Sequence, residues 1–387
     1  MKELRERLLG RVGALEKRIL EVSRFVHRHP EEGFKERACS RFLVSKLAAA
    51  GFKVVRPLKK LPTAFVAAKG RGGPRLGFIA EYDSLPEIGH GCGHNLIAAS
   101  GFGAALALAP FVDELGGSVT LFGTPAEENG SAKVDMVRAG LFDGVDAVVM
   151  IHPEGHWSVN TAGLALDALE FEFRGRSSHA SGTPFEGINA LDAMVLFFNG
   201  IGALRQQLRG DARVHGIITK GGLAPNVIPD HTEARFYVRS SGRARLDEVT
   251  RKVRACARAA ALATGCSLGV REFERPVDEI VNNPGLASLF EEHLRSLGVR
   301  ELAGADEVPG SSDFGTVSRL VPSLYVYAAT APKGSDLHTR EFARLSLTPL
   351  AHRSLMTAVR ALALTGLDLL AQPKLLRSAA RQLRRRR

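Results

Sequence analysis

Cysteine is scarce in this chain, and its scarcity bounds the kind of protein that the chain can be. Only four cysteines occur among 387 residues, too few for a disulfide framework in a chain of this length. A reducing compartment is therefore expected, and we predict a cytoplasmic protein. The first residues are charged and helical in pattern, so no apolar signal region is expected at this end.

Long, uniformly apolar runs are also missing. The longest uncharged run, residues 96–112, is interrupted by Ser100, Gly101, Gly103 and Pro110, whereas a membrane span needs roughly 20 residues of more uniform apolarity. We interpret this run as a helix buried against a sheet, and we expect no membrane partner.

Two motifs of common enzyme classes are absent or lack the context that they need. A Gly-x-Ser-x-Gly sequence occurs at residues 265–269, but it follows a predicted helix and opens a predicted strand, whereas a nucleophilic serine needs the sharp strand-to-helix turn that exposes it. The glycine-rich residues 70–73 lack the Lys-Ser/Thr ending of a phosphate-binding loop. The catalytic chemistry of the chain must therefore be sought in other residues.

Positive charge is abundant but concentrated at one end. Seven basic residues and no acid occur from Lys374 onwards, and without them the net charge of +11 falls to +4. We expect residues 373–387 to be a solvated, disordered basic tail, and nucleic acid is not expected as a partner. A nucleic-acid-associated protein that uses the Arg-rich tail is kept as an alternative.

The order of the predicted elements indicates two domains and an α/β fold. Alternating helix and strand patterns fill residues 1–164 and return in 276–372, which predicts a catalytic α/β domain in two parts. Residues 165–275 follow the order β-α-β-β-α-β, which is typical of a ferredoxin-like domain. We therefore expect this second domain to be inserted between the halves of the first.

Potential metal ligands follow the predicted strands of the first domain. The strand at 75–80 precedes Asp83 and the Gly-His-Gly-Cys-Gly-His-Asn sequence of residues 89–95, which contains Cys92 and His94. The strand at 118–124 precedes Glu128, and the strand at 147–151 ends at His152. Carboxyl ends of neighbouring parallel strands lie together, and thiolate, imidazole and carboxylate groups bind transition metals.

Glu127 and Glu128 offer two carboxylates at one strand end. One could bind a metal while the other serves as a general base. An acidic turn of this kind is otherwise an ordinary solvated feature, and a lone histidine such as His152 or His338 is more often structural. The residues alone therefore leave both interpretations open.

Several ordered sequence blocks resemble a known family. They are residues 29–34 (His-Pro-Glu-Glu-Gly-Phe), 81–86 (Glu-Tyr-Asp-Ser-Leu-Pro), 89–95, 125–128 (Pro-Ala-Glu-Glu), 152–153 (His-Pro), 175–180, 187–193 and 335–338 (Ser-Asp-Leu-His). Together they resemble the aminoacylase and carboxypeptidase family of two-metal amidohydrolases, family twenty of the metallopeptidases. The residues in these blocks are most similar to the amidohydrolase branch of the family, in particular to aminobenzoyl-glutamate hydrolase and the dipeptidases with basic amino-acid specificity.

The resemblance implies roles for individual residues. Cys92, His94, Glu128, His152 and His338 match the ligands of two divalent metal ions, zinc or manganese first and cobalt or nickel as further possibilities. Glu127 matches the general base, and His179 matches a histidine that steadies the intermediate in a partner subunit's site. Asn226 and Arg239 match substrate-binding positions. Other branches carry His-x-Asp where this chain has Glu81-Tyr82-Asp83, and we expect Asp83 to orient a metal ligand.

The expected function is hydrolysis of the amide bond in an N-acyl amino acid or a dipeptide-like substrate. The resemblance also implies a homodimer that forms through the inserted domain, which would act as a lid. A non-catalytic, metal-binding member of the same fold is the main alternative. The acyl group, the amino acid and the metal are left open by the sequence.

Overall fold

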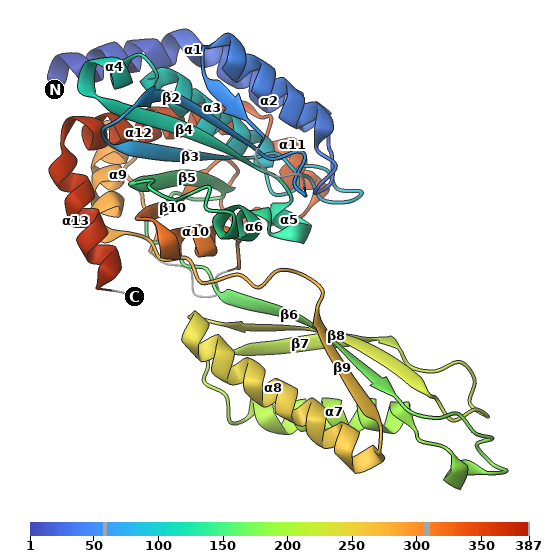
Figure 1. Ribbon diagram of the computed structural model, residues 1–387. Helices are drawn as coiled ribbons and strands as arrows, with labels where there is room; N and C mark the ends of the chain where they lie inside the picture. The colour runs from blue at the N-terminus through green and yellow to red at the C-terminus, as the bar shows by residue number, and fades with distance from the viewer. Residues whose placement is uncertain (57–59, 305–309, 386–387) are drawn as a thin grey trace. The chain divides into compact units, whose positions relative to one another are not determined.

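The computed structural model describes residues 1–56, 60–304 and 310–385 and consists of two compact units (Figure 1). Unit 1 comprises Met1–Ala162 and Ile280–Arg387, and unit 2 comprises Gly163–Glu279. Each unit has its own hydrophobic core. Unit 2 is therefore an insertion in the sequence of unit 1.

Unit 1 is built on a six-stranded sheet with the strand order β1-β2-β4-β3-β5-β10. The strands are β1 (Lys53–Val55), β2 (Phe65–Arg71), β3 (Arg75–Glu81), β4 (Gly117–Thr124), β5 (Ala147–Glu154) and β10 (Ser323–Ala329). β3, β4, β5 and β10 are parallel, whereas β1 and β2 pair antiparallel. Because β3 lies between β4 and β5, the carboxyl ends of these three strands are neighbours, where open α/β sheets form their sites.

Helices cover both faces of this sheet, which explains why its strands are almost continuously apolar. On β3, Phe78 faces one core and Ile79 faces the other, as the alternation of a strand requires. The first face carries α1 (Lys2–Arg28), α2 (Arg37–Ala49), α3 (His94–Leu108), α9 (Pro284–Ser296) and α12 (Pro349–Ala371). The second face carries α6 (Ala132–Arg138) and α10 (Phe314–Leu320). Three shorter helices also belong to this unit: α4 (Phe111–Leu115), α5 (Glu127–Gly130) and α11 (Arg340–Leu345).

α12 is long and apolar enough by length and composition to cross a membrane. However, 83% of its most apolar window is buried within the protein, and its apolar residues belong to the core that α1 and α3 share. Its composition is therefore accounted for by its place in the core of unit 1. The uncharged run at 96–112 is likewise buried apart from Pro110, and most of it forms α3.

Unit 2 has a four-stranded antiparallel sheet with the order β7-β8-β6-β9. Its elements are β6 (Ala165–Arg174), α7 (Ala190–Arg205), β7 (Arg213–Lys220), β8 (His231–Ser240), α8 (Arg243–Thr264) and β9 (Ser267–Glu272), with a short 3-10 helix at Pro184–Glu186. Phe171, Phe197 and Phe236 pack together in its core, between the sheet and the two helices.

The C-terminal basic segment is folded, which corrects the expectation of a disordered tail. Its described part forms α13 (Pro373–Arg384), which packs against α9 and α12. Leu376, Ala379 and Leu383 are buried at helical spacing, and the Asn283 side chain donates a hydrogen bond to the carbonyl of Ala379 (3.0 Å). The abundance of arginine masked this apolar stripe in the sequence, because Arg377, Arg381 and Arg384 of the same helix are exposed.

We expect Leu376→Ala to loosen α13, because truncating a buried leucine costs about 2–5 kcal/mol. Hydrogen exchange of a peptide spanning 373–384 should then become faster than in the wild type. Arg377→Ala, which alters the adjacent exposed residue, should leave the exchange unchanged. Rapid, unprotected exchange of this peptide in the wild type would contradict a docked helix.

Candidate metal centre

The ends of three neighbouring strands supply most of the candidate site. Glu81 ends β3, Glu127 and Glu128 follow β4, and His152 lies in the second half of β5. His94 is the first residue of α3, and Cys92 precedes it by two positions. Gly93 between them has a φ of 72°, a left-handed conformation that glycine adopts without strain. This conformation lets the chain turn from the site into the helix.

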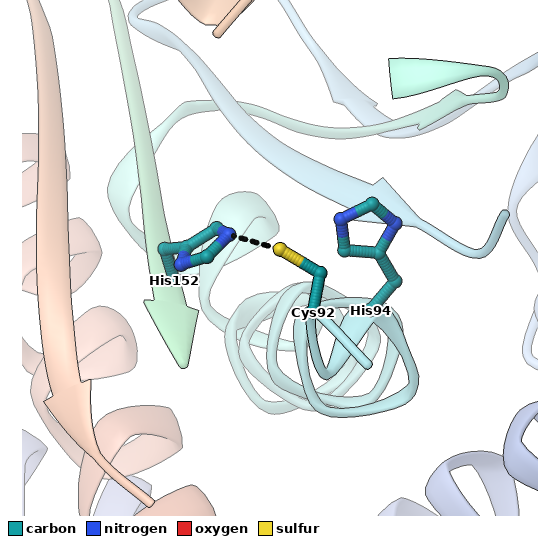
Figure 2. Close-up of side chains that lie close together, drawn as sticks. All are labelled: Cys92, His94 and His152. Atoms are coloured by element: carbon teal, nitrogen blue, oxygen red, sulfur yellow. Dashed lines mark hydrogen bonds between the residues drawn. The ribbon is translucent and has the colours of Figure 1, made fainter. Parts of the chain in front are cut away.

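Cys92, His94 and His152 form the most deeply buried group of donors (Figure 2). Their ligand atoms lie within 4.8 Å of one another. The ring of His152 bonds to the Pro153 carbonyl through Nδ1 (2.9 Å), which leaves Nε2 facing the sulfur of Cys92 at 3.3 Å. Because a ring that donates from Nδ1 accepts at Nε2, His152 presents a lone pair toward the centre.

Asp83 orients two parts of the site. Its Oδ1 lies 2.9 Å from Nδ1 of His94, and its Oδ2 accepts a hydrogen bond from the backbone N–H of Glu128 (3.0 Å). Burial alone would raise the pKa of Asp83, but the contacts with His94 and Glu128 lower it. The carboxylate thus fixes the ring of His94 with Nε2 pointing at the other donors, which is the geometry that orienting carboxylates give to metal-binding histidines.

His338 joins the site from a loop that is distant in sequence. Its Nε2 lies 3.6 Å from Oε2 of Glu128, and these two residues form a second donor group with Cys92. The backbone N–H of His338 donates to the carbonyl of Gly91 (2.9 Å). A Cβ at Gly91 would lie 3.3 Å from Cα of His338, so the glycine permits this close approach. The side chain of His338 is 56% exposed and forms the open side of the centre.

The donor set fits transition-metal ions. Nε2 of His94 and Oε1 of Glu128 are buried, lie 3.8 Å apart and have no hydrogen-bond partner among the described residues. Buried polar atoms without partners are rare and costly, and a cation between them would satisfy both. One thiol, three imidazoles and one carboxylate form a mixed sulfur, nitrogen and oxygen donor set of the kind that binds divalent transition-metal ions.

Glu127 lies beside this set and forms a third donor group with His94 and Glu128. Burial raises the pKa of Glu127 well above its ordinary value, and the negative charges of Glu81 and Glu128 add to this effect. A raised pKa makes the ionised form of a carboxyl group a stronger base. The structure therefore places a carboxylate of raised basicity next to the candidate ligands.

Glu36 is a site-supporting residue that the sequence interpretation missed. It is buried, and its Oε1 accepts the backbone N–H of Ala126 (2.8 Å) while its Oε2 accepts the hydroxyl of Thr63 (2.9 Å). Ala126 has a φ of 54°, which costs an alanine about 1–2 kcal/mol. Glu36 therefore stabilises the strained turn that leads into Glu127 and Glu128. The sequence block at residues 29–34 that resembles the family ends two positions before Glu36, so Glu36 was not singled out.

Lys133 and Asp313 are two further residues that the sequence interpretation missed. Lys133 is fully buried and pairs with both Asp313 and Glu81. Asp313 precedes α10 in the position of a capping residue, but its carboxylate makes no capping hydrogen bond. A lysine on a short helix gives no sign of burial in the sequence.

The three remaining predicted residues belong to unit 2. His179 and Asn226 lie on adjacent backbone segments, since the N–H of Ala180 donates to the carbonyl of Asn226 (3.0 Å). Nδ1 of His179 accepts the backbone N–H groups of Ser181 (3.2 Å) and Gly182 (3.1 Å), so the proton of the neutral ring lies on Nε2. Arg239 is on β8, with its guanidinium 5.5 Å from the centre of the Tyr237 ring.

Comparison with solved structures shows which proteins share this fold. The chain shares its fold with the aminobenzoyl-glutamate utilization protein of Klebsiella pneumoniae, with a TM-score of 0.73 and 20% identity over 93% of this chain and 98% of the other. A dinuclear metal binding peptidase of the M20 family from Bacillus subtilis gives a TM-score of 0.69 and 23% identity over 92% and 99%. The chain thus shares the two-unit fold of these two proteins.

Sequence comparison identifies the family. Residues 77–363 match Peptidase family M20/M25/M40, and the chain belongs to this family. It is 35% identical to the Xaa-Arg dipeptidase of Mus musculus, over 98% of this chain and 92% of the relative. It is 28% identical to a subunit of the p-aminobenzoyl-glutamate hydrolase of Escherichia coli strain K12, over 99% and 95%. The family resemblance stated from the sequence is confirmed, and the chain is a hydrolase of carbon–nitrogen bonds.

We expect Glu36→Gln to change how stability depends on pH. Burial raises the pKa of Glu36 to about 7, and the charge of Asp83 adds to this effect. The folded wild type therefore loses roughly 3 kcal/mol of stability as the pH rises from about 4.5 to about 7, because the unfolded chain ionises first. Glutamine does not titrate, so the free energy of unfolding of the variant should increase by about this amount, relative to that of the wild type, between pH 4.5 and 8.

The measurement is the free energy of unfolding of metal-free protein across this pH range. Glu32→Gln, which alters an exposed carboxylate four residues earlier, should give a curve parallel to that of the wild type. A parallel curve for Glu36→Gln would show that Glu36 has an ordinary pKa.

Proposed function

We propose that this protein is a metal-dependent amidohydrolase that cleaves dipeptide-like or N-acyl amino acid substrates with a free carboxylate on the leaving amino acid. The observation that carries the proposal is the convergence of five donors, Cys92, His94, Glu128, His152 and His338, beside the basic carboxylate of Glu127. Relatives named as an Xaa-Arg dipeptidase and a p-aminobenzoyl-glutamate hydrolase cleave bonds of this class. An Xaa-Arg dipeptide is the first substrate to test.

Two divalent cations, zinc or manganese, are proposed as cofactors. The two donor groups that share Cys92 would hold them: His94 and His152 in one group, Glu128 and His338 in the other. When bound, such a pair of cations polarises the amide carbonyl and lowers the pKa of a water near it. Asp83 keeps Nε2 of His94 directed at the centre throughout.

Glu127 is proposed as the general base. Its carboxylate takes a proton from the attacking water and returns it to the leaving nitrogen, which turns a poor leaving group into a free amine. The hydrogen bond that the backbone N–H of Ala126 donates to Glu36 holds the turn that presents Glu127 to the centre. One carboxylate can serve both transfers, because the proton that Glu127 takes from the water is the proton that it later donates to the leaving nitrogen.

Unit 2 is proposed as a lid and dimerisation domain. The hydrogen bonds at Nδ1 of His179 set Nε2 as a donor, which suits stabilisation of a developing oxyanion. Asn226 and Arg239 offer an amide donor and a guanidinium fork for the amide and the carboxylate of the substrate. We propose that the protein is a homodimer in which His179 serves the partner subunit's centre, and that it acts in the cytoplasm.

Glu127→Gln is expected to lower kcat by at least about 10²-fold, because general-base catalysis contributes about 10²–10⁴-fold. Its metal content should remain that of the wild type, as the five proposed ligands are intact. Glu128→Gln, the matched control one residue away, should instead reduce the bound metal. Hydrolysis of an Xaa-Arg dipeptide and elemental analysis of the same preparations provide the readouts. Full activity of Glu127→Gln would eliminate it as the base.

Mixing two inactive variants tests whether His179 acts across a dimer. Glu127→Gln and His179→Ala subunits, exchanged at equal concentrations, form about one half mixed dimers by random pairing. Each mixed dimer regains one intact site only if His179 serves the other subunit, so activity should return to about a quarter of the wild-type value. If His179 acts within its own subunit, every site retains a defect and the mixture stays inactive.

A further inference from the structure

Lys133 is enclosed between two carboxylates and is 0% exposed. Its Nζ lies 2.6 Å from Oδ1 of Asp313 and 2.7 Å from Oε1 of Glu81. The backbone N–H of Lys133 also donates to Oδ2 of Asp313 (3.0 Å). Both oxygens of Asp313 are therefore paired with Lys133, whereas Glu81 has only one oxygen paired.

The second oxygen of Glu81 faces the candidate metal centre. Oε2 lies 3.7 Å from Nε2 of His94, which is too far for a hydrogen bond, and neither atom has a hydrogen-bond partner among the described residues. The Glu81 side chain is only 1% exposed, so bulk solvent does not reach it. Two ligands that bind one cation at about 2.0–2.2 Å lie roughly 3–4 Å from each other, which matches this separation.

The charge count in this cluster leaves one negative charge that Lys133 does not neutralise. A single lysine paired with Asp313 would form a neutral buried pair, but Glu81 adds a second negative charge in contact with the same ammonium group. A surplus charge in the protein interior is strongly unfavourable unless another group neutralises it. The only other group that Oε2 of Glu81 faces in the described ion pairs is the ring of His94, a proposed ligand.

We propose that Glu81 belongs to the divalent-cation site and supplies Oε2 to the cation that His94 binds. Lys133, fixed by Asp313, is the positioning residue that holds the other oxygen and keeps the carboxylate aimed at the centre. This inference rests on the proposed function, since it requires a divalent cation at His94. It adds a ligand from the end of β3 to the five already proposed.

The test compares two variants, each of which neutralises one of the two carboxylates that pair with Lys133. Glu81→Gln removes the oxygen that faces His94, whereas Asp313→Asn alters the carboxylate that is fully paired with Lys133. Zinc affinity is measured on metal-free protein by competition with a chelator, and the thermal stability of each variant is recorded. We expect Glu81→Gln to bind zinc about 10–100-fold more weakly and Asp313→Asn to stay within about threefold of the wild type.

Cobalt absorption gives a second readout that does not depend on activity. The visible spectrum of the Co²⁺-loaded protein reports the ligands of the ion, so it should change in Glu81→Gln and stay unchanged in Asp313→Asn. Lys133→Arg, which keeps a positive charge between the two carboxylates, should retain a zinc affinity near the wild-type value.

Equal zinc affinity in Glu81→Gln and the wild type would overturn the inference. So would an equal loss in Glu81→Gln and Asp313→Asn, because it would indicate only a structural ion pair. Absence of zinc binding by the wild type itself would instead overturn the proposed function. The wild type thus tests the function, and the comparison of the variants tests the role of Glu81.

Discussion

The structure of unit 1 depends on one electrostatic constraint, the burial of many carboxylates in a small space. Glu81, Asp83, Glu127 and Glu128 all lie at the carboxyl ends of β3 and β4, away from most solvent. Lys133 is the buried ammonium group that pairs with this cluster in the described chain. A sheet covered on both faces can hold such a concentration of charge only if each group is fixed by a partner, which explains the dense layer of hydrogen bonds behind the candidate ligands.

That supporting layer comes largely from segments that contribute no ligand. Glu36, just before α2, holds the turn at Ala126, and Asp83 holds both His94 and the backbone of Glu128. The N-terminal helical region is therefore part of the site as well as part of the core. A change near residue 36 can alter the catalytic turn without touching a metal ligand.

The sequence predicts the features that depend on local pattern. Cys92, His94, Glu128 and His152 could be grouped because each follows or ends a recognisable strand, and parallel strands bring such ends together. Lys133 and Asp313 could not be paired, because 180 positions separate them and neither carries a local signal. The helix α13 was missed because its charge pattern is conspicuous and its apolar stripe contains only a few residues.

The insertion of unit 2 also sets the order in which the molecule is completed on the ribosome. β5 is synthesised early, but its parallel neighbour β10 and the loop that carries His338 follow only after the whole of unit 2. At about 5–20 residues per second, the nascent chain exposes that edge of β5 for roughly ten to forty seconds. An unpaired edge invites intermolecular strand pairing, so the period before β10 arrives is when this chain is most exposed to aggregation. The centre cannot acquire its full ligand set until that period ends.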